Sequence, residues 1–451
     1  MSGTSDQAAG AVRFGSSQHV PRSEDVPLLT GAGRFTDDVR VPGETYAVFV
    51  RSQMAHAVIR KVDGSAARGL PGVLAVITGA DVAQLGQIPA VVPITGSDGK
   101  AMRTAGWPVL AADRVRYVGE AVAVVVAETL RQALDAAEAV IVDLDGLSAA
   151  SDAERALAPG APQLWDKAPG NTALDWEDGD KAAVEAAMAA AHHVERVRLI
   201  DTRLAPVAME PRAAIASYDP ATDRYTLQAP TQGVALVRRV LAEIVFKMPP
   251  EKLRVLTGDV GGGFGMKAQT YPEYAAVMFA AKAVGRPVRW TGTRLESFLG
   301  DTAGRDGILE GELALDKDGR FLALRARTIV GIGAYTTTFS AIFTTANTKN
   351  CLSSVYVFPA IHIAVKDVFT NAAPLGPYRG AGRPEAILII ERLIDGAATA
   401  LGIDRADLRR RNMIPPSAMP YTTPNGPIYD SGEFAAVLDK ALTAADWAGF
   451  A

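Results

Sequence analysis

The amino-acid sequence predicts a mixed α+β and α/β fold with more than one domain. Its 451 residues are enough for two or three domains at roughly 150 residues per domain. Short runs rich in valine and isoleucine, each bounded by glycine, proline or aspartate, alternate with segments in which apolar residues recur every three or four positions. The 42 glycines and 27 prolines favour a loop-rich architecture over a helical bundle.

The first α+β module is expected over residues 19–165. It contains three β-patterns, at residues 45–52, 72–79 and 120–127. Residues 128–145 then read as a helix that runs into a strand, with Leu130, Leu134 and Ala137 on one helix face. A proline-rich stretch that follows is expected to separate this module from the rest of the chain.

The second segment, residues 180–451, alternates strands and helices more strongly. Strand patterns fall at residues 192–205, 224–230, 252–260, 307–331 and 355–371. Helical patterns fall at residues 181–191, 231–247, 270–285, 385–402 and 403–414. The helices that reach Gly285 and Gly402 are expected to end there, because glycine readily takes the left-handed conformation that closes a helix.

Composition and charge exclude several classes of protein. Forty-six Lys and Arg against fifty Asp and Glu leave a net charge of -4, which does not suit a nucleic-acid or anionic-membrane surface. The single cysteine, Cys351, cannot form an internal disulfide, a cysteine-ligated zinc site or an iron–sulfur cluster within this chain. No apolar run is long enough to span a membrane. Residues 1–18 read as a disordered tail without a signal-peptide pattern, so a cytoplasmic location is expected.

A glycine run at residues 261–265, with the sequence GGGFG, follows a predicted strand and precedes a predicted helix. Successive backbone N–H groups in such a turn can form a nest that binds an anion. The spacing matches neither the dinucleotide-binding GxGxxG pattern nor the P-loop, so a nucleotide-dependent dehydrogenase is disfavoured. A tight strand-to-helix turn without a ligand remains the alternative interpretation.

A second irregular loop, AAPLGPYRGAGRPEA at residues 372–386, lies directly before a long predicted helix. Three prolines and three glycines around Arg379 and Arg383 fit a rigid loop shaped to approach a large cofactor. The structural alternative is an arginine that caps carbonyl groups inside a buried loop. The five histidines show no metal-ligand spacing.

These motifs, in this order, resemble the large, molybdenum-cofactor-binding subunit of the molybdenum hydroxylases, the xanthine dehydrogenase, aldehyde oxidase and carbon monoxide dehydrogenase family. The segments that carry the resemblance are VPRSEDVPLLTGAGRFTDDV, RSQMAHAVIRKVD, LAADRVRYVGEAVAVVVAET, RLAPVAMEPRAAIA, APTQG, GDVGGGFGMK, GRPVRW, PYRGAGRPEA and LRRRNMI. The resemblance runs from about residue 19 to residue 451. It implies an N-terminal α/β hammerhead domain at residues 19–165, followed at 180–451 by the first molybdenum-cofactor-binding domain, incomplete relative to the family.

The resemblance also implies roles for particular residues. By the family pattern, Gln232 would hydrogen-bond an apical oxygen ligand of molybdenum. The glycine loop would supply backbone amides and an aromatic wall, and the YRG loop would lie against the pterin. The cofactor-binding positions implied in these two loops are Gly262, Gly263, Phe264, Gly265, Arg379 and Gly380. No side chain is expected to ligate the metal directly, because the pterin holds it.

Departures from the family pattern bear on the substrate. Gly380 stands where carbon monoxide oxidation requires a copper-binding cysteine, so that chemistry is not expected. Ala268 and Asn347 stand where purine oxidation uses Glu and Arg, so xanthine is not expected. Ala381 replaces a second aromatic wall and leaves the pocket more open. With Phe264 and Tyr378 these three residues form the expected substrate pocket, which suits an aldehyde or an N-heteroaromatic ring.

The family's catalytic glutamate, its general base, has no matching motif in this sequence. The resemblance therefore implies a split large subunit, with the glutamate on a second molybdopterin-binding chain. Further partners would be a [2Fe–2S] subunit and an FAD subunit, and heteromers of this kind could pair into a dimer. The cofactor would be molybdenum–molybdopterin, either as such or in its cytosine dinucleotide form, and water would supply the oxygen. The alternative is a cofactor-free scaffold that keeps the fold and binds partners.

Overall fold

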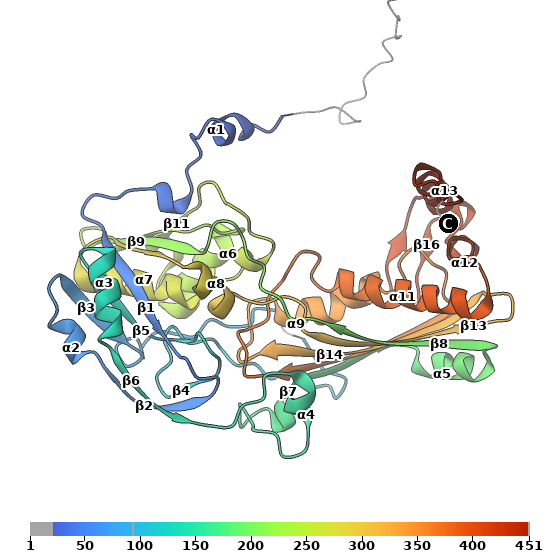
Figure 1. Ribbon diagram of the computed structural model, residues 1–451, viewed down its shortest axis with the longest axis horizontal. Coiled ribbons are helices and arrows are strands. Elements are labelled where there is room, and N and C mark those ends of the chain that lie inside the picture. Colours follow the sequence, from blue (N-terminus) through green and yellow to red (C-terminus); the bar gives the residue numbers. More distant parts are fainter. Residues whose placement is uncertain (1–20, 93, 450–451) are drawn as a thin grey trace, which may run out of the picture.

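Two β-sheets with their covering helices organise the computed structural model (Figure 1), which describes residues 21–92 and 94–449. The tail predicted at residues 1–18 lies outside the described residues. A seven-stranded sheet has the order β11-β10-β9-β12-β1-β5-β3, and a five-stranded sheet has the order β7-β15-β14-β13-β8. A three-stranded sheet, β4-β2-β6, lies beside the larger one and consists of β2 (Ala57–Asp63), β4 (Arg114–Val115) and β6 (Ile141–Gly146).

The seven-stranded sheet joins segments that are far apart in the sequence. Its strands are β1 (Thr45–Arg51), β3 (Val73–Thr78), β5 (Ala121–Ala127), β9 (Ala213–Asp219), β10 (Arg224–Gln228), β11 (Leu253–Leu256) and β12 (Val288–Thr291). β1 pairs in parallel with β12, with Thr45 opposite Val288. The sheet therefore crosses the boundary predicted between residues 165 and 180, and the division of the chain at that point stays a prediction.

Helices cover both faces of this sheet. α2 (Ser65–Arg68) and α3 (Leu130–Glu138) pack on one face, and α7 (Pro272–Val284) packs on the other. In β5, Val124 and Val126 contact the α7 side while Val125 contacts the α3 side. Burial on both faces explains why β5 is an uninterrupted apolar run instead of an alternating one. α7 ends at Gly285 with φ 65°, as its sequence predicts.

Two helical details differ from the sequence-based expectation. In α3 the buried residues are Ala133 and Ala136, whereas Leu130 and Leu134 are half exposed. Small side chains face the sheet there because α3 packs closely over β1 and β5. The helix predicted at residues 231–247 is divided into α6 (Val234–Arg239) and a π-helical turn at Val240–Val245.

The five-stranded sheet forms the second half of the structure. Its strands are β7 (Thr172–Gly179), β8 (His193–Asp201), β13 (Gly307–Leu315), β14 (Phe321–Gly333) and β15 (Ala360–Phe369). The long helix α11 (Arg383–Leu401) buries Ile389, Leu393 and neighbouring residues against one face. On the other face lie α4 (Ala153–Leu157) and α5 (Lys181–Ala190), and Figure 1 shows α11 and α5 on opposite sides.

Short elements complete the described chain. They are α1 (Asp25–Leu29), α8 (Arg294–Gly300), α9 (Ser340–Ile342), α10 (Thr348–Cys351), α12 (Arg405–Asn412), β16 (Tyr421–Thr422), β17 (Ile428–Tyr429) and α13 (Phe434–Ala444). A π-helical turn at Phe343–Asn347 joins α9 to α10. Among the described residues, no helix is both long and apolar enough to cross a membrane.

Candidate functional site

The glycine run lies in the loop that leaves β11 and turns into α7. Phe264 has φ 53° and Gly265 has φ 93°, so the chain reverses through the left-handed region. Residue 265 must be a glycine for two reasons. Its backbone is left-handed, and a Cβ there would lie 2.6 Å from the carbonyl oxygen of Pro377. The absence of a side chain lets the two predicted loops touch through their backbones.

Gln232 packs into this loop from the segment before α6. Its Oε1 accepts a hydrogen bond from the Gly265 N–H at 2.9 Å, and its own backbone N–H donates to the Lys267 carbonyl at 3.1 Å. A Cβ on Gly263 would lie 2.6 Å from the Gln232 side chain, so a glycine is needed there for the glutamine to approach. The structure thus brings together Gln232 and the GGGFG loop.

The YRG loop closes the other side. The Arg379 N–H donates to the Phe264 carbonyl oxygen at 2.9 Å, and the Arg379 guanidinium carbon lies 4.6 Å from the centre of the Phe264 ring. Three consecutive residues, Gly380, Ala381 and Gly382, have positive φ of 95°, 44° and 90°. The left-handed conformation of Ala381 is a strained backbone state of the kind that is concentrated at binding sites.

Free backbone donors are what the two loops have in common. Within the described residues, the N–H groups of six loop positions have no hydrogen-bond acceptor: Gly262, Gly263, Phe264, Tyr378, Gly380 and Gly382. Pre-aimed N–H groups of this kind suit an anionic ligand that needs many donors and few side chains. The chemistry of these donors therefore fits a pterin cofactor.

A buried ion pair that sequence reasoning missed holds the glycine loop in place. Lys267 is fully buried, and its Nζ lies 2.8 Å from Glu210 Oε2. The same oxygen accepts the Gly261 N–H at 2.9 Å. Burial lowers the pKa of Lys267, and the carboxylate opposes that shift. Both residues stand inside motifs that carried the resemblance, but nothing local indicates that they meet across 57 residues.

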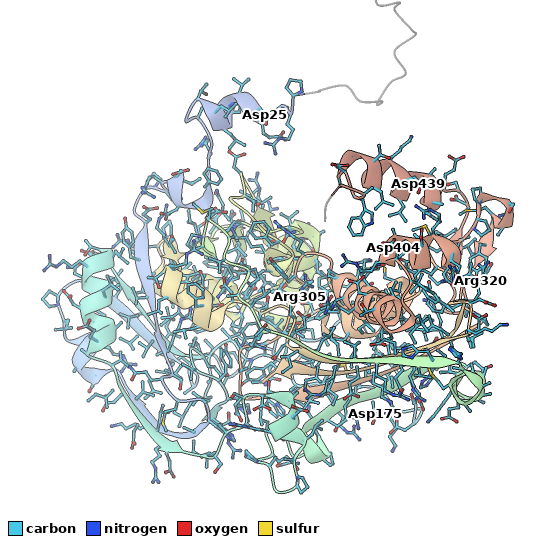
Figure 2. The ribbon with its side chains drawn as sticks, turned by 45° about the vertical axis from the view of Figure 1, so that its right-hand side comes forward. Asp25, Asp175, Arg305, Arg320, Asp404 and Asp439 are labelled. Carbon is cyan, nitrogen blue, oxygen red and sulfur yellow. The ribbon has the colours of Figure 1, made fainter. Side chains whose placement is uncertain are left out.

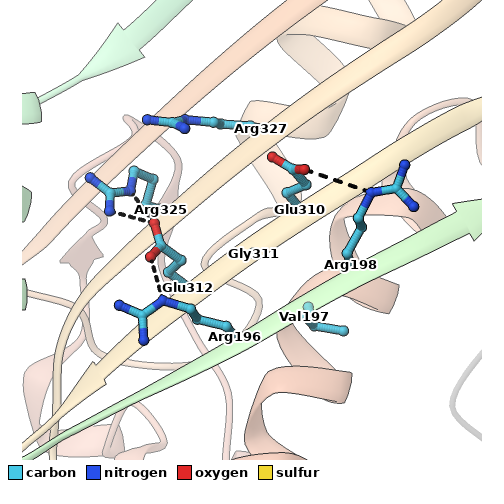
Figure 3. Close-up of a pocket in the computed structure, with 8 residues that line it drawn as sticks. All are labelled: Arg196, Val197, Arg198, Glu310, Gly311, Glu312, Arg325 and Arg327. Atoms are coloured by element: carbon cyan, nitrogen blue, oxygen red, sulfur yellow. Dashed lines mark hydrogen bonds and ion pairs between the residues drawn. The ribbon is translucent and has the colours of Figure 1, made fainter. Parts of the chain in front are cut away.

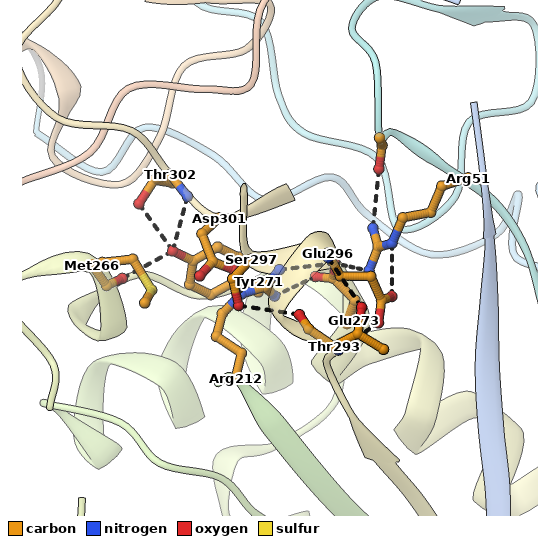
Figure 4. Close-up of polar contacts among 11 residues, drawn as sticks. Arg51, Arg212, Met266, Tyr271, Glu273, Thr293, Glu296, Ser297, Asp301 and Thr302 are labelled. Atoms are coloured by element: carbon orange, nitrogen blue, oxygen red, sulfur yellow. Dashed lines mark hydrogen bonds and ion pairs between the residues drawn. The ribbon is translucent and has the colours of Figure 1, made fainter. Parts of the chain in front are cut away.

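A second buried network, shown in Figure 4, ties this region to the N-terminal strands. Arg212 contacts Glu273 at 2.7 Å and Asp301 at 2.5 Å, and Glu273 also contacts Arg51 of β1 at 2.9 Å. Burial alone would raise the pKa of Glu273, but the Arg212 and Arg51 charges outweigh it and lower that pKa to about 2. The network positions α7 behind the glycine loop.

The remaining expected pocket residues lie around the same loops. Asn347, in the π-helical turn after α9, donates from Nδ2 to the Ala381 carbonyl oxygen at 3.0 Å. Tyr378 packs over Gly304, where a Cβ would lie 2.5 Å from the Tyr378 Cβ. Ala268 ends the short 3₁₀ turn that follows Gly265, and its N–H donates to the Gly265 carbonyl at 3.0 Å.

Two concave regions lie away from the loops. One, of about 340 Å³, lies on the five-stranded sheet and is lined by arginines and glutamates of β8, β13 and β14 (Figure 3). Its charges are largely paired, as in Arg196–Glu312 and Arg325–Glu312. The second, of about 450 Å³, is lined by residues of β10, α6 and β11, among them Val234, two positions after Gln232. Among the described residues, no group of His, Cys, Asp and Glu side chains could hold a metal ion.

Comparison with known families finds two matches that together cover most of the chain. Residues 30–148 match the aldehyde oxidase and xanthine dehydrogenase a/b hammerhead domain. Residues 164–413 match the molybdopterin cofactor-binding domain, which includes every residue of the two loops.

Individual relatives agree with these matches. The chain is 34% identical to the carbon monoxide dehydrogenase large chain of Hydrogenophaga pseudoflava over 94% of its own length and 53% of the relative's. The crystal structure of quinoline 2-oxidoreductase from Pseudomonas putida 86 superposes with a TM-score of 0.89 at 36% identity, covering 96% of this chain and 54% of that one. The chain thus spans about half the length of these relatives.

One curated relative is matched over most of its own length. The nicotinate dehydrogenase large molybdopterin subunit of Eubacterium barkeri is 28% identical, and the match covers 86% of this chain and 87% of the relative. A polypeptide of about this extent therefore exists among the similar proteins.

Proposed function

Since this chain belongs to the molybdenum hydroxylase family as a relative of its large, molybdopterin-binding subunits, we propose that it forms one wall of a molybdenum-cofactor site in a hydroxylase. The observation that carries this proposal is the pair of interlocked loops whose backbone N–H groups have no acceptor within the described residues. A bound molybdenum–molybdopterin, plain or as the cytosine dinucleotide, would supply hydroxylation of a C–H bond with oxygen from water.

The chain's own residues would bind and orient that group. The free N–H groups of the glycine loop and of Gly380 and Gly382 would donate to its anionic atoms. Gln232 is exposed and its Oε1 accepts the Gly265 N–H, so its amide nitrogen Nε2 is the donor left to face a ligand oxygen. Phe264, with Arg379 stacked on it, would exclude water from one side.

The proposed substrate is an aldehyde or an N-heteroaromatic ring. Support comes from the small residues Ala268 and Ala381 beside the loops, and from relatives whose names include quinoline and nicotinate. The similarity to a carbon monoxide dehydrogenase large chain gives no support for excluding carbon monoxide as a substrate. That exclusion rests on Gly380 alone, which offers no thiolate for copper.

We also propose that the general base and the remaining cofactor contacts come from a second molybdopterin-binding chain. The relative from Eubacterium barkeri supports such an arrangement, because the match to this chain covers 87% of that relative. Electrons would leave through [2Fe–2S] and FAD subunits, since Cys351 alone cannot hold a cluster.

Metal analysis of the purified complex, with the partners that co-purify, tests this function. We expect molybdenum in the wild-type complex and turnover of an N-heteroaromatic compound or an aldehyde with a dye as electron acceptor. Gln232→Ala should lower turnover by about tenfold or more, because an orienting donor is lost. Gln84→Ala, which changes an exposed glutamine outside both loops, is the matched control.

Two results would contradict the proposal. Less than about a tenth of a molybdenum per complex, under good cofactor supply, would favour the cofactor-free scaffold. Turnover of carbon monoxide, in preference to the organic substrates, would overturn the substrate assignment.

A further inference from the structure

A strained turn follows α8 where the two halves of the molecule meet. Arg305 and Asp306 are consecutive non-glycine residues with φ of 67° and 65°, and Figure 2 places Arg305 between the two halves. Each left-handed residue of this kind costs free energy and persists only where its surroundings enforce it. Here Asp306 is held by Arg203 at 2.7 Å and by the Gly331 N–H, which donates to the Asp306 carbonyl at 3.0 Å.

The strained backbone directs the Arg305 side chain onto the YRG loop. Its Nη2 donates to the Arg379 carbonyl oxygen at 2.9 Å, and its Nη1 donates to Glu385 Oε1 at 2.9 Å. A longer contact of 3.5 Å joins Nη1 to the Tyr378 carbonyl oxygen, and the guanidinium carbon lies 5.0 Å from the centre of the Tyr378 ring. The Arg305 and Glu385 side chains are only 12% and 15% exposed.

These contacts hold the loop at two points. Tyr378 and Arg379 precede its two left-handed glycines, and Glu385 lies in the first turn of α11. The Tyr378 carbonyl also accepts the Ala381 N–H at 2.8 Å, which closes the turn. Between Arg379 and Gly382, the carbonyl groups on this side are engaged, and the N–H groups of Gly380 and Gly382 have no acceptor among the described residues.

We propose that Arg305 is a positioning residue for the cofactor loop: it binds the carbonyl groups of Tyr378 and Arg379 and the carboxylate of Glu385, and so keeps residues 378–385 in the conformation that presents the free N–H groups. This inference rests on the proposed function. Arg305 itself need not touch the cofactor, and its effect passes through the loop backbone.

The test must separate positioning from simple stability. Arg305→Gln alone leaves the Glu385 carboxylate buried without its cation, which destabilises any fold. The double variant Arg305→Gln/Glu385→Gln removes that charge but still leaves the two carbonyl groups unheld. The matched control is Arg409→Gln/Glu391→Gln, because this pair, 2.6 Å apart, joins Glu391 of α11 to Arg409 of α12 without contacting the loop.

Two measurements are made on the full chain with its co-purifying partners. Hydrogen exchange of peptides covering residues 376–386 is followed in protein from a host that makes no molybdopterin, and molybdenum is quantified in protein from a competent host. The Arg305/Glu385 variant should exchange the amides of Arg379 and Ala381 about tenfold faster than wild type and retain about a fifth of the molybdenum or less. The control should keep both values within about twofold.

Exchange and molybdenum content within about twofold of wild type in the Arg305/Glu385 variant would overturn the proposal. If the wild-type complex contains no molybdenum, the proposed function fails, and the exchange result still decides whether Arg305 holds the loop. If the double variant does not fold, Arg305→Lys replaces it. Lysine keeps a charge for Glu385 but cannot span both carbonyl groups, so the same increase in exchange is expected.

Discussion

At the scale of single residues, Asp367 shows how burial sets a protonation state. This carboxyl group on β15 is fully buried, one oxygen accepts the Thr344 hydroxyl at 3.0 Å, and the other has no partner within the described residues. Burial raises its pKa to about 8. The side chain therefore carries a proton near neutral pH and ties β15 to the π-helical turn that holds Asn347.

This protonation predicts a pH-dependent stability. Between about pH 4, where the unfolded aspartate titrates, and its folded pKa of about 8, the native state binds one proton more than the unfolded state. Stability should therefore fall as pH rises through this window. In Asp367→Asn, which cannot ionise, melting temperatures measured from about pH 5 to pH 9 should fall less steeply than in wild type.

The exposed Asp145→Asn is the control and should keep the wild-type slope. Glu120, whose pKa burial raises to about 7, contributes a slope of the same sign, so some dependence should remain in both variants. An Asp367→Asn slope equal to that of wild type would show that Asp367 is already ionised in the folded protein.

At the scale of elements, the two glycines that bound α11 serve different purposes. Gly382 before the helix and Gly402 after it both have positive φ, 90° and 65°. A Cβ at Gly402 would meet nothing within 4 Å, whereas a Cβ at Gly382 would overlap the carbonyl oxygen of Phe343. Gly402 is thus a helix terminator, while Gly382 also lets the YRG loop contact the π-helical turn.

Alanine substitution should separate these two roles. Gly402→Ala should cost about 1–2 kcal/mol, the price of one left-handed alanine. Gly382→Ala should lower the melting temperature at least twice as much, because the backbone of the turn must also move. Thermal unfolding of both variants, side by side, checks this. Equal losses would mean that the contact with Phe343 relaxes freely.

At the scale of the whole molecule, the N-terminal module is not a closed unit. β1 pairs with β12, and Arg51 of β1 forms ion pairs with Glu273 and Glu296 at 2.9 Å each. The fragment 21–165 expressed alone should therefore lack a cooperative thermal transition, since it would expose the β1 edge and leave Arg51 without partners. Circular dichroism and amide dispersion in NMR measure this, with the full chain as reference. A cooperative fragment melting close to the full chain would contradict the prediction.

Local pattern was enough to locate most elements and the two loops. The apolar run of β5, the glycine ends of α7 and α11, and the family motifs around Gln232 all depend on neighbouring residues, which the sequence displays directly. The family assignment follows from such motifs and is confirmed by the two domain matches. The site roles of individual residues stay predictions.

Contacts between distant residues could be decided only by the tertiary structure. Glu210 meets Lys267 across 57 positions, Arg305 meets Arg379 across 74, and Arg51 meets Glu273 across 222. Each depends on the register in which whole sheets and helices pack, and no local propensity encodes that register. The physical reason is that burial and ion pairing act between surfaces that become neighbours only after the chain has folded, whereas helix, strand and turn preferences act within a few residues.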